Sequence, residues 1–203
     1  ILEFLIQPLT RLPEADQLVK KGQLVYSAPT EAFFIRLKVT AFAAFVMTLP
    51  VILWQLWRFV TPGLHPHEKR YAVPFILVSL GLFVAGIFLA FYTLPKALEV
   101  LTGFAGEELI LLPRASDYLS FVLVLIAGFG LAFEFPVVLI ALVLVGVLST
   151  QALRKARRMA WVILLIAAAV ITPTQDPITL AMMAVPLGLL YEATILTARL
   201  LKK

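Results

Sequence analysis

The residue of this sequence best suited to carry chemistry is a glutamate inside an apolar stretch. Glu134 is the only charged residue of 118–148 and lies near the middle of that segment. An acidic side chain at the centre of a bilayer costs roughly 2.5–3.5 kcal/mol on insertion scales. The functional interpretation is a polar docking point, or an ion or proton site. The structural alternative is a protonated glutamate that is hydrogen-bonded to a neighbour at similar depth, such as Thr48.

A second carboxylate stands alone in a polar loop. Glu68 is the only acid of PGLHPHEKR, residues 62–70. Such a group usually forms a solvated salt bridge, here with Lys69 or Arg70. The alternative is a receptor for a cationic ligand, because a carboxylate can bind an arginine guanidinium through two hydrogen bonds. Composition alone favours the salt bridge.

The remaining polar candidates have simple structural interpretations. His65 and His67 form an H-x-H pair, which offers too few ligands for a metal site, so we expect no metal and no cofactor. Asp176 is expected to form an Asx-type turn between two apolar segments. Glu192 is expected to be an interfacial carboxylate beside Tyr191, near the end of the last helix.

Several function classes are excluded by what the sequence lacks. It has no cysteine, which removes disulfides and thiolate chemistry. It has no H-E-x-x-H, G-x-S-x-G or Walker A motif, so we expect no enzyme. An intramembrane hydrolase would need a nucleophile–base pair that we do not find. The net charge of +5 does not indicate nucleic-acid binding, because in a membrane protein the side on which the basic residues lie matters more.

The elements that must position these residues are membrane helices. Hydrophobic residues make up 62% of the 203 residues, charged residues only 14%, and the mean hydropathy is +0.99. We therefore expect an all-α, polytopic membrane helical bundle, a single transmembrane domain over 1–203. The expected transmembrane helices are 32–60, 71–98, 118–148, 159–171 and 178–197. Residues 1–31 are expected to be the tail of a missing first helix and a cap, on the outer side of the membrane.

The last two helices are expected to form a short hairpin. TPTQDP, residues 172–177, is a breaker sequence between them. Residues 159–171 reach only about 20 Å at 1.5 Å per residue. Such a short helix must thin the bilayer or lie behind neighbouring helices, and we expect local thinning on the side where it faces lipid.

The loop charges predict the orientation. One side carries a single acid, Glu68, and ten basic residues, which are Arg58, Lys69, Arg70, Arg154, Lys155, Arg157, Arg158, Arg199, Lys202 and Lys203. The other side carries seven basic and nine acidic residues. The ten-basic side is expected to be cytoplasmic, with the C-terminus inside and residue 1 outside. ILEFLIQPL, residues 1–9, then resembles the end of a missing helix, which gives five visible spans of an expected six.

Small and aromatic residues complete the expected architecture. Gly128, Gly130 and Ala132 should let another helix approach closely. Four expected spans contain a proline, at Pro50, Pro74, Pro136 and Pro186. These prolines suggest a curved, concave shape, although membrane helices also tolerate proline well. Three tryptophans are expected to form a cytoplasmic interfacial belt, Trp54, Trp57 and Trp161.

Four motifs together resemble a known family. They are W-R-F-V-x-P-G-L-x-x-x-E-K-R (57–70), F-G-L-A-F-E-F-P (129–136), T-P-x-x-D (172–176) and A-V-P-L-x-x-L-Y-E (184–192). Their order and spacing resemble TatC, the core receptor subunit of the twin-arginine protein translocase. The resemblance covers essentially the whole chain.

The resemblance implies a fold, a function and a set of partners. The fold is a concave, glove-like arrangement of six transmembrane helices with both termini cytoplasmic, in the inner (cytoplasmic) membrane. The function is the recognition of twin-arginine signal peptides and the export of folded proteins, driven by the protonmotive force. The implied partners are TatB, TatA, the signal peptides of folded precursors, further copies of the chain and the lipid bilayer.

The resemblance also implies roles for single residues. Glu68 matches the glutamate that contacts the signal-peptide arginines, and Phe59 and Pro62 lie in the same matched stretch. Glu134 matches the intramembrane glutamate that is implicated in partner contacts. The residues matched to partner contacts or structural positions are Pro50, Pro173, Asp176 and Glu192.

Two departures and one competing function accompany the resemblance. The family's N-terminal cytoplasmic segment, which supplies a second acid for the twin arginines, is not in this sequence, so we expect weaker signal-peptide binding. Leu180 stands where the family often has glutamine. The alternative function is a secondary transporter or proton-coupled channel built around Glu134. That alternative predicts internal repeats, which we do not find.

Overall fold

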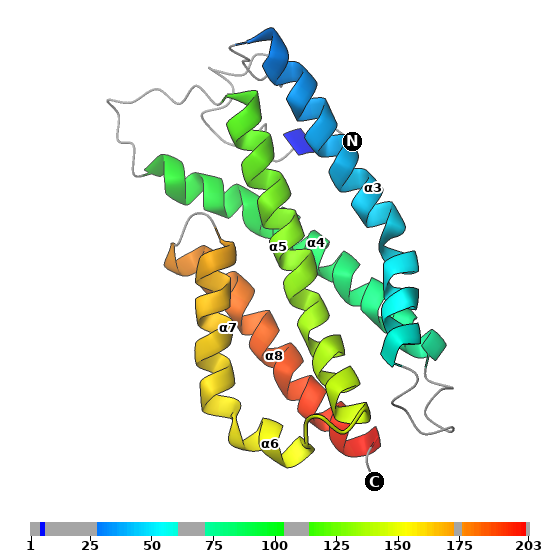
Figure 1. The fold of residues 1–203 in the computed structure, drawn as a ribbon. Coiled ribbons are helices and arrows are strands. Elements are labelled where there is room, and N and C mark those ends of the chain that lie inside the picture. The colour runs from blue at the N-terminus through cyan, green and yellow to red at the C-terminus, as the bar shows by residue number, and fades with distance from the viewer. Residues whose placement is uncertain (1–4, 7–27, 61–71, 104–113, 173–175, 202–203) are drawn as a thin grey trace.

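The computed structural model describes residues 5–6, 28–60, 72–103, 114–172 and 176–201, and these residues are helical apart from short connections. The elements are α3 (Pro29–Val60), α4 (Ala72–Gly103), α5 (Ala115–Leu144), α6 (Thr150–Lys155), α7 (Arg157–Ile171) and α8 (Pro177–Leu201). Figure 1 shows them as long rods that cross one another, with α6 as a short bend before α7.

Four of these helices are long and apolar enough to cross a membrane. The qualifying segments are Thr30–Arg58, Val73–Gly103, Ala115–Leu144 and Pro177–Leu200. The remaining long element, α7, has 15 residues, about 22 Å at 1.5 Å per residue, which is less than the ~30 Å of a typical hydrocarbon core. The all-α membrane fold predicted from composition is therefore confirmed.

The helix that contains Glu134, α5, ends before residue 148, the end expected from the sequence. Leu144 is the last helical residue of α5, and Gly146 follows with a φ of 86°. Glycine adopts this left-handed conformation without steric cost, so it stops the helix. Ser149 then caps α6, because its hydroxyl accepts a hydrogen bond from the Ala152 amide at 3.0 Å. The short helix α6 was not predicted.

Some prolines of the chain begin helices, and others lie inside them. Pro29 and Pro177 are the first residues of α3 and α8, where a missing amide costs nothing. Pro74 lies in the first turn of α4, so the prediction of a proline inside that span was wrong at this position. Pro95 instead lies inside α4, and the helix continues for two more turns to Gly103, beyond its expected end at 98.

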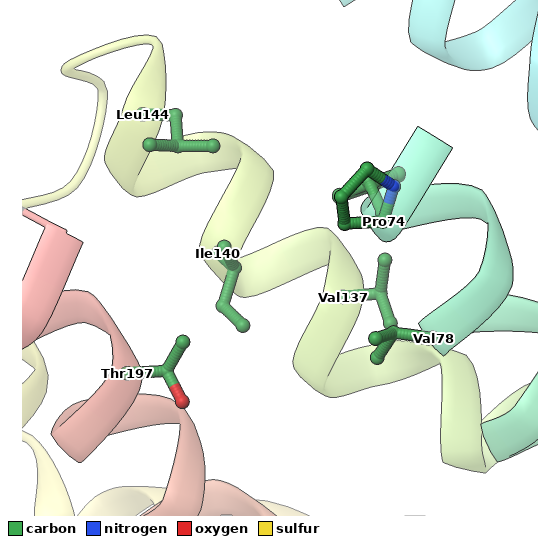
Figure 2. Close-up of a pocket in the computed structure, with 7 residues that line it drawn as sticks. Pro74, Val78, Val137, Ile140, Leu144 and Thr197 are labelled. Atoms are coloured by element: carbon green, nitrogen blue, oxygen red, sulfur yellow. The ribbon is translucent and has the colours of Figure 1, made fainter. Parts of the chain in front are cut away.

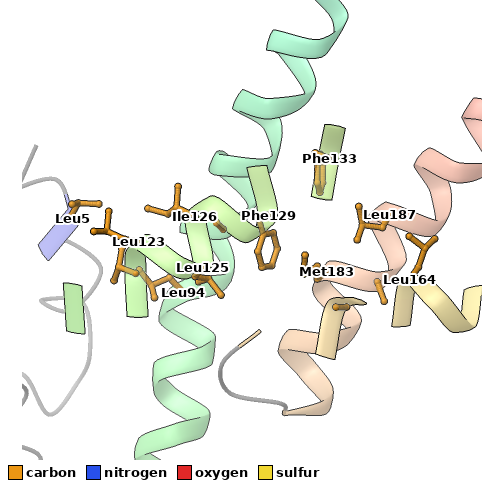
Figure 3. Packing of buried hydrophobic residues seen from close by; sticks show 14 of the residues in the cluster. Leu5, Leu94, Leu123, Leu125, Ile126, Phe129, Phe133, Leu164, Met183 and Leu187 are labelled. Carbon is orange, nitrogen blue, oxygen red and sulfur yellow. The ribbon is translucent and has the colours of Figure 1, made fainter. Parts of the chain in front are cut away.

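α5 is the central element of the arrangement. It contacts α3, α4, α7 and α8. In Figure 1, α4 crosses α5 obliquely, and α3 and α7 lie to either side of α5. One apolar core runs through these contacts (Figure 3). Leu94 of α4, Phe129 of α5 and Met183 of α8 are fully buried in it.

Glycines allow the helices to come this close. A Cβ placed on Gly86 of α4 would lie 2.6 Å from the Phe129 carbonyl oxygen, and one on Gly130 would lie 2.7 Å from the Phe83 ring. A Cβ on Gly128 would lie 2.0 Å from the Ile171 side chain of α7. The prediction that the glycines before the central glutamate admit neighbouring helices is confirmed.

Candidate functional site

The intramembrane carboxyl predicted from the sequence is held between two helices. Glu134 lies on α5 and is partly buried, and its Oε2 accepts a hydrogen bond from the Ser79 hydroxyl of α4. Ser79 itself is completely buried. The other carboxyl oxygen, Oε1, has no hydrogen-bond partner among the described residues. Oε1 is itself buried, so the site holds one carboxyl oxygen that is shielded by the protein and unpaired among the described residues.

The hydroxyl proposed from the sequence as partner of this carboxyl was the wrong one. Thr48 is exposed on α3, and its hydroxyl donates to the backbone carbonyls of Ala44 and Phe45 of its own helix, at 2.9 and 3.0 Å. Ser79 was not singled out, although it is a polar side chain in a charge-free apolar segment. The depth of a residue along the chain does not tell which helix faces Glu134.

The close crossing of α4 and α5 keeps the Ser79–Glu134 pair in register. Gly86 lies two helical turns beyond Ser79, and Gly130 lies one turn before Glu134. At the crossing, a methyl group added to Gly86 would lie 2.6 Å from the Phe129 carbonyl oxygen and 3.0 Å from the Gly130 Cα. Side chains at this point would push the helices apart and lengthen the polar contact.

An apolar pocket opens on the same face, between the carboxyl and the helix ends. It has a volume of about 170 Å³. Figure 2 shows its walls, which come from α4, α5 and α8. The lining residues are Pro74, Phe75, Val78, Val137, Ile140, Leu144 and Thr197. The lining residues Phe75 and Val137 lie one helical turn from Ser79 and from Glu134, so the pocket begins beside the polar pair.

The loop that carries Glu68 is bracketed by two helices in contact. Glu68 and Pro62, predicted to bind signal peptides, lie outside the described residues, and Phe59 is described only as part of the α3 backbone. Trp57, near the end of α3, packs its ring on Phe75, near the start of α4, at 4.5 Å between centroids. The two ends of the loop are therefore held together.

This packing corrects one prediction about the tryptophans. Trp57 is only 3% exposed and lies in a cluster with Leu144, so it is a core residue and not part of an interfacial belt. Trp54 is exposed, as a belt residue would be. The Trp161 ring of α7 lies against Gly188 of α8, where a Cβ would come within 2.0 Å of it.

Glu192 has a specific partner. Its Oε2 accepts a hydrogen bond from the Arg157 guanidinium at 2.7 Å, which ties α8 to the start of α7. The adjacent Tyr191 is buried, and its hydroxyl donates to the Leu153 carbonyl of α6 at 2.7 Å. This pair of contacts fixes the α6–α7 bend on α8, and neither contact was predicted.

The opposite end of the α7–α8 hairpin is closed by a cap. Asp176 is buried and its Oδ1 accepts the Thr179 amide hydrogen at 2.8 Å, so the predicted turn former caps the N-terminus of α8. The Thr172 hydroxyl donates to the Ala168 carbonyl at 2.7 Å. Pro173 lies outside the described residues, whereas Pro50 is an exposed residue within α3.

The beginning of the chain is fastened to the start of α5. The Tyr118 hydroxyl donates to the Leu5 carbonyl at 3.0 Å, and the Ser116 amide donates to the Glu31 carboxylate at 3.2 Å. The starts of α3 and α5 and residue 5 therefore lie together. Within the described ranges, no three His, Asp or Glu side chains gather as a metal site would require, and His65 and His67 lie outside those ranges.

Comparison with known proteins identifies relatives across the chain. Residues 1–186 match the family model described as Sec-independent protein translocase protein (TatC). The TatC proteins of Frankia casuarinae, Magnetococcus marinus and Aquifex aeolicus are 40%, 39% and 39% identical to it. The matches cover 97%, 98% and 98% of this chain and 56%, 72% and 81% of those proteins. The chain thus spans just over half of the Frankia protein and a larger part of the others.

The fold has solved counterparts as well. The crystal structure of the twin arginine translocase receptor TatC in DDM is 38% identical and superposes with a TM-score of 0.78. The match covers 97% of this chain and 85% of that one. At this identity and TM-score, the likeness extends over nearly all of the elements described above.

Proposed function

The chain belongs to the TatC family of Sec-independent protein translocases, and we propose from this premise that it receives twin-arginine signal peptides at the loop between α3 and α4. It is a non-enzymatic transport subunit in a multi-pass membrane fold. Its place in the translocase is that of the core TatC subunit, in the cytoplasmic membrane. The family match, which includes the whole 57–70 motif, is the observation that carries this function.

The receptor role rests on one carboxylate in a loop with fixed ends. Glu68 supplies the anion, and the guanidinium group of an arginine binds it through two parallel hydrogen bonds, which lysine cannot form. Phe59 and Pro62 shape the site on the α3 side. The Trp57–Phe75 contact holds the two helix ends together, so the loop needs less ordering when the peptide binds.

The proposed topology is a six-helix, concave, glove-like protein of which this chain contributes five spans within one domain. α7 and α8 form the final hairpin, the C-terminus is cytoplasmic, and residues 1–31 lie on the periplasmic side. The hydrogen bond from Tyr118 to Leu5 supports this, because it joins the first residues to the end of α5 opposite the basic residues. The short α7 thins the bilayer where it meets lipid.

The partner surfaces follow from the intramembrane carboxyl and the hairpin. The contact with TatB, TatA or another copy of the chain is placed at Glu134, where Ser79 occupies Oε2 and the buried Oε1 has no hydrogen-bond partner among the described residues. Pro50, Pro173 and Asp176 shape the helices and hairpin that these partners contact, and Glu192 holds the hairpin on the α6–α7 bend. The protonmotive force drives export of the folded cargo through this assembly.

The alternative built on Glu134 alone, a secondary transporter, has less support. A transporter of that kind would have inverted repeats with broken helices in corresponding positions. The range matched by the family, residues 1–186, includes both Glu134 and the loop motif, whereas the transporter hypothesis leaves the loop motif unexplained.

Photocrosslinking tests the receptor role. A photoreactive residue at Phe59 or His67 of the full protein is illuminated in membranes that contain TatA and TatB, with a twin-arginine precursor or its twin-lysine variant. We expect crosslinks with the arginine precursor that disappear with lysine. The absence of crosslinks to either precursor would contradict the assignment.

A matched pair of variants assigns the anion. Glu68→Gln removes the carboxylate with little change of shape, and Glu99→Gln does the same at an exposed position near the far end of α4. Precursor crosslinking and export are expected to fall in Glu68→Gln and to persist in Glu99→Gln. Equal activity of both variants would remove Glu68 from the receptor site.

A further inference from the structure

The pocket between α4, α5 and α8 can accept only apolar groups. Its lining is hydrocarbon apart from Thr197 (Figure 2). The Thr197 hydroxyl already donates its hydrogen to the Ala193 carbonyl at 2.9 Å. The pocket therefore offers no free donor to a polar ligand, and an occupant must be apolar where it fills this space.

The size of the pocket limits the occupant to a narrow chain. Its volume is about 170 Å³, and an apolar cavity of roughly 150 Å³ is known to hold a benzene molecule. About six carbon atoms fit in such a space. A helix with side chains is roughly 10–12 Å across and is too wide to enter. A stretch of one fatty acyl chain has the required width and polarity.

The pocket lies at the end of the helices where a lipid headgroup would be. Leu144 is the last residue of α5, Pro74 lies in the first turn of α4, and Thr197 is near the end of α8. Two arginines belong to the same region. Arg58 follows Trp57, which packs on the lining residue Phe75, and Arg199 follows Thr197 by two residues.

The charge at this end selects the headgroup. Lipid tails are as apolar as the lining, so seating an acyl chain gains little by itself, and preference for one lipid must come from the headgroup. The described basic residues at this end are Arg58, Arg154, Lys155, Arg157, Arg158 and Arg199. Among the described residues there, the acid is Glu192, and it is paired with Arg157. The excess charge is therefore positive.

We propose that this pocket is a binding site for one anionic phospholipid, with an acyl chain seated between α4, α5 and α8 and the headgroup phosphate near Arg58 and Arg199. The long arginine side chains can extend from the helix ends to the headgroup level. The site is independent of signal-peptide recognition at Glu68. It places a lipid beside Trp57, and the indole of this residue then reports on occupancy.

The test measures fluorescence quenching by brominated lipids. The full chain is reconstituted in phosphatidylcholine vesicles that contain a fixed fraction of phosphatidylglycerol or phosphatidylcholine with bromine on the acyl chain. Trp54 and Trp161 are replaced by phenylalanine, so that Trp57 is the remaining tryptophan, and bound bromine near it quenches its emission. We expect brominated phosphatidylglycerol to quench more than brominated phosphatidylcholine, with a preference of about fivefold for each arginine that contacts the headgroup. High salt should reduce this preference.

Two variants of the same helix separate the pocket from the general lipid surface. Val78→Phe fills the pocket from a side chain that is 55% exposed, and Val84→Phe adds the same ring at a position that is 62% exposed and outside the pocket. The excess quenching by phosphatidylglycerol should disappear in Val78→Phe and remain in Val84→Phe. Arg58→Gln and Arg199→Gln should each lower the preference with the pocket intact.

Three results would overturn the proposal. Equal quenching by the two brominated lipids would mean that no headgroup is selected. Excess quenching that survives Val78→Phe would place the lipid outside the pocket. Loss of quenching when an apolar peptide is added, without any preference between the lipids, would assign the pocket to peptide.

Discussion

Replacing Gly86 with alanine should separate the two helices that hold the intramembrane carboxyl. The new methyl group would lie 2.6 Å from the Phe129 carbonyl oxygen and 3.0 Å from the Gly130 Cα. Both neighbours are backbone atoms, so no side chain can rotate away. An ordinary contact begins near 3.4 Å, and α4 and α5 must therefore move apart by about 0.8 Å at this point.

The cost of this movement follows from what the interface contains. Phe83, Phe129 and Leu94 are among the fully buried side chains of α4 and α5. A gap of 0.5–1 Å loses roughly a quarter to a half of the dispersion energy of the contacts affected. Overpacking of a core typically costs about 1–3 kcal/mol, and we expect Gly86→Ala to lie in this range.

Gly81 supplies the control on the same helix. A Cβ at Gly81 meets no atom within 4 Å, and alanine is a better helix former than glycine by about 0.5–1 kcal/mol. We expect Gly81→Ala to be neutral or slightly stabilising. The two variants should then differ by about 1–4 kcal/mol in the free energy of unfolding.

The assay is reversible unfolding in mixed micelles, titrated with a denaturing detergent and followed by circular dichroism. Both glycine variants are compared with the unsubstituted chain. Equal stability of Gly86→Ala and Gly81→Ala, within about 0.5 kcal/mol, would refute the close backbone crossing of α4 and α5.

Three further pairs of variants test single contacts by the same unfolding assay. Ser79→Ala should lower the free energy of unfolding by about 0.5–2 kcal/mol because it removes the donor to the intramembrane carboxyl. Ser79→Thr keeps a hydroxyl and should recover part of this stability. No loss in Ser79→Ala would contradict the hydrogen bond between Ser79 and Glu134. Asp176→Ala should lower the free energy of unfolding by about 1 kcal/mol because it removes the α8 cap. Asp176→Asn can still cap the helix and should keep most of this stability. Equal losses in the two variants would argue against capping. Arg157→Gln should lower the free energy of unfolding by less than about 1 kcal/mol, because the ion pair of Arg157 with Glu192 is partly exposed. Arg158→Gln should cause no measurable loss. Equal losses in the two variants would argue against a specific role of Arg157.

The features that depend on composition and local spacing could be predicted from the sequence. The apolar segments indicated membrane helices, because burying a backbone in lipid requires internal hydrogen bonds over about 20 residues. Asp176 before Pro177 predicted a turn that the structure shows as a helix cap. The motif around Glu68 indicated the family by its residue types and spacing alone. Each of these signals is formed by residues that are close together in the sequence, so it can be recognised without the tertiary structure.

The features that depend on helix crossings were decided by the tertiary structure. Thr48 and Ser79 are both hydroxyls at plausible depth, and only the approach of α4 to α5 at Gly86 selects Ser79 as the partner of Glu134. The position of Trp57 in the sequence indicated an interfacial residue, whereas packing on Phe75 makes it part of the core.

The contact between Arg157 and Glu192 joins residues 35 positions apart, and no local pattern marks it. Hydropathy indicates the depth of a residue in the membrane, and local spacing indicates which residues share one face of a helix. The choice of neighbour is made by the close packing of several helices at once, which no single segment encodes.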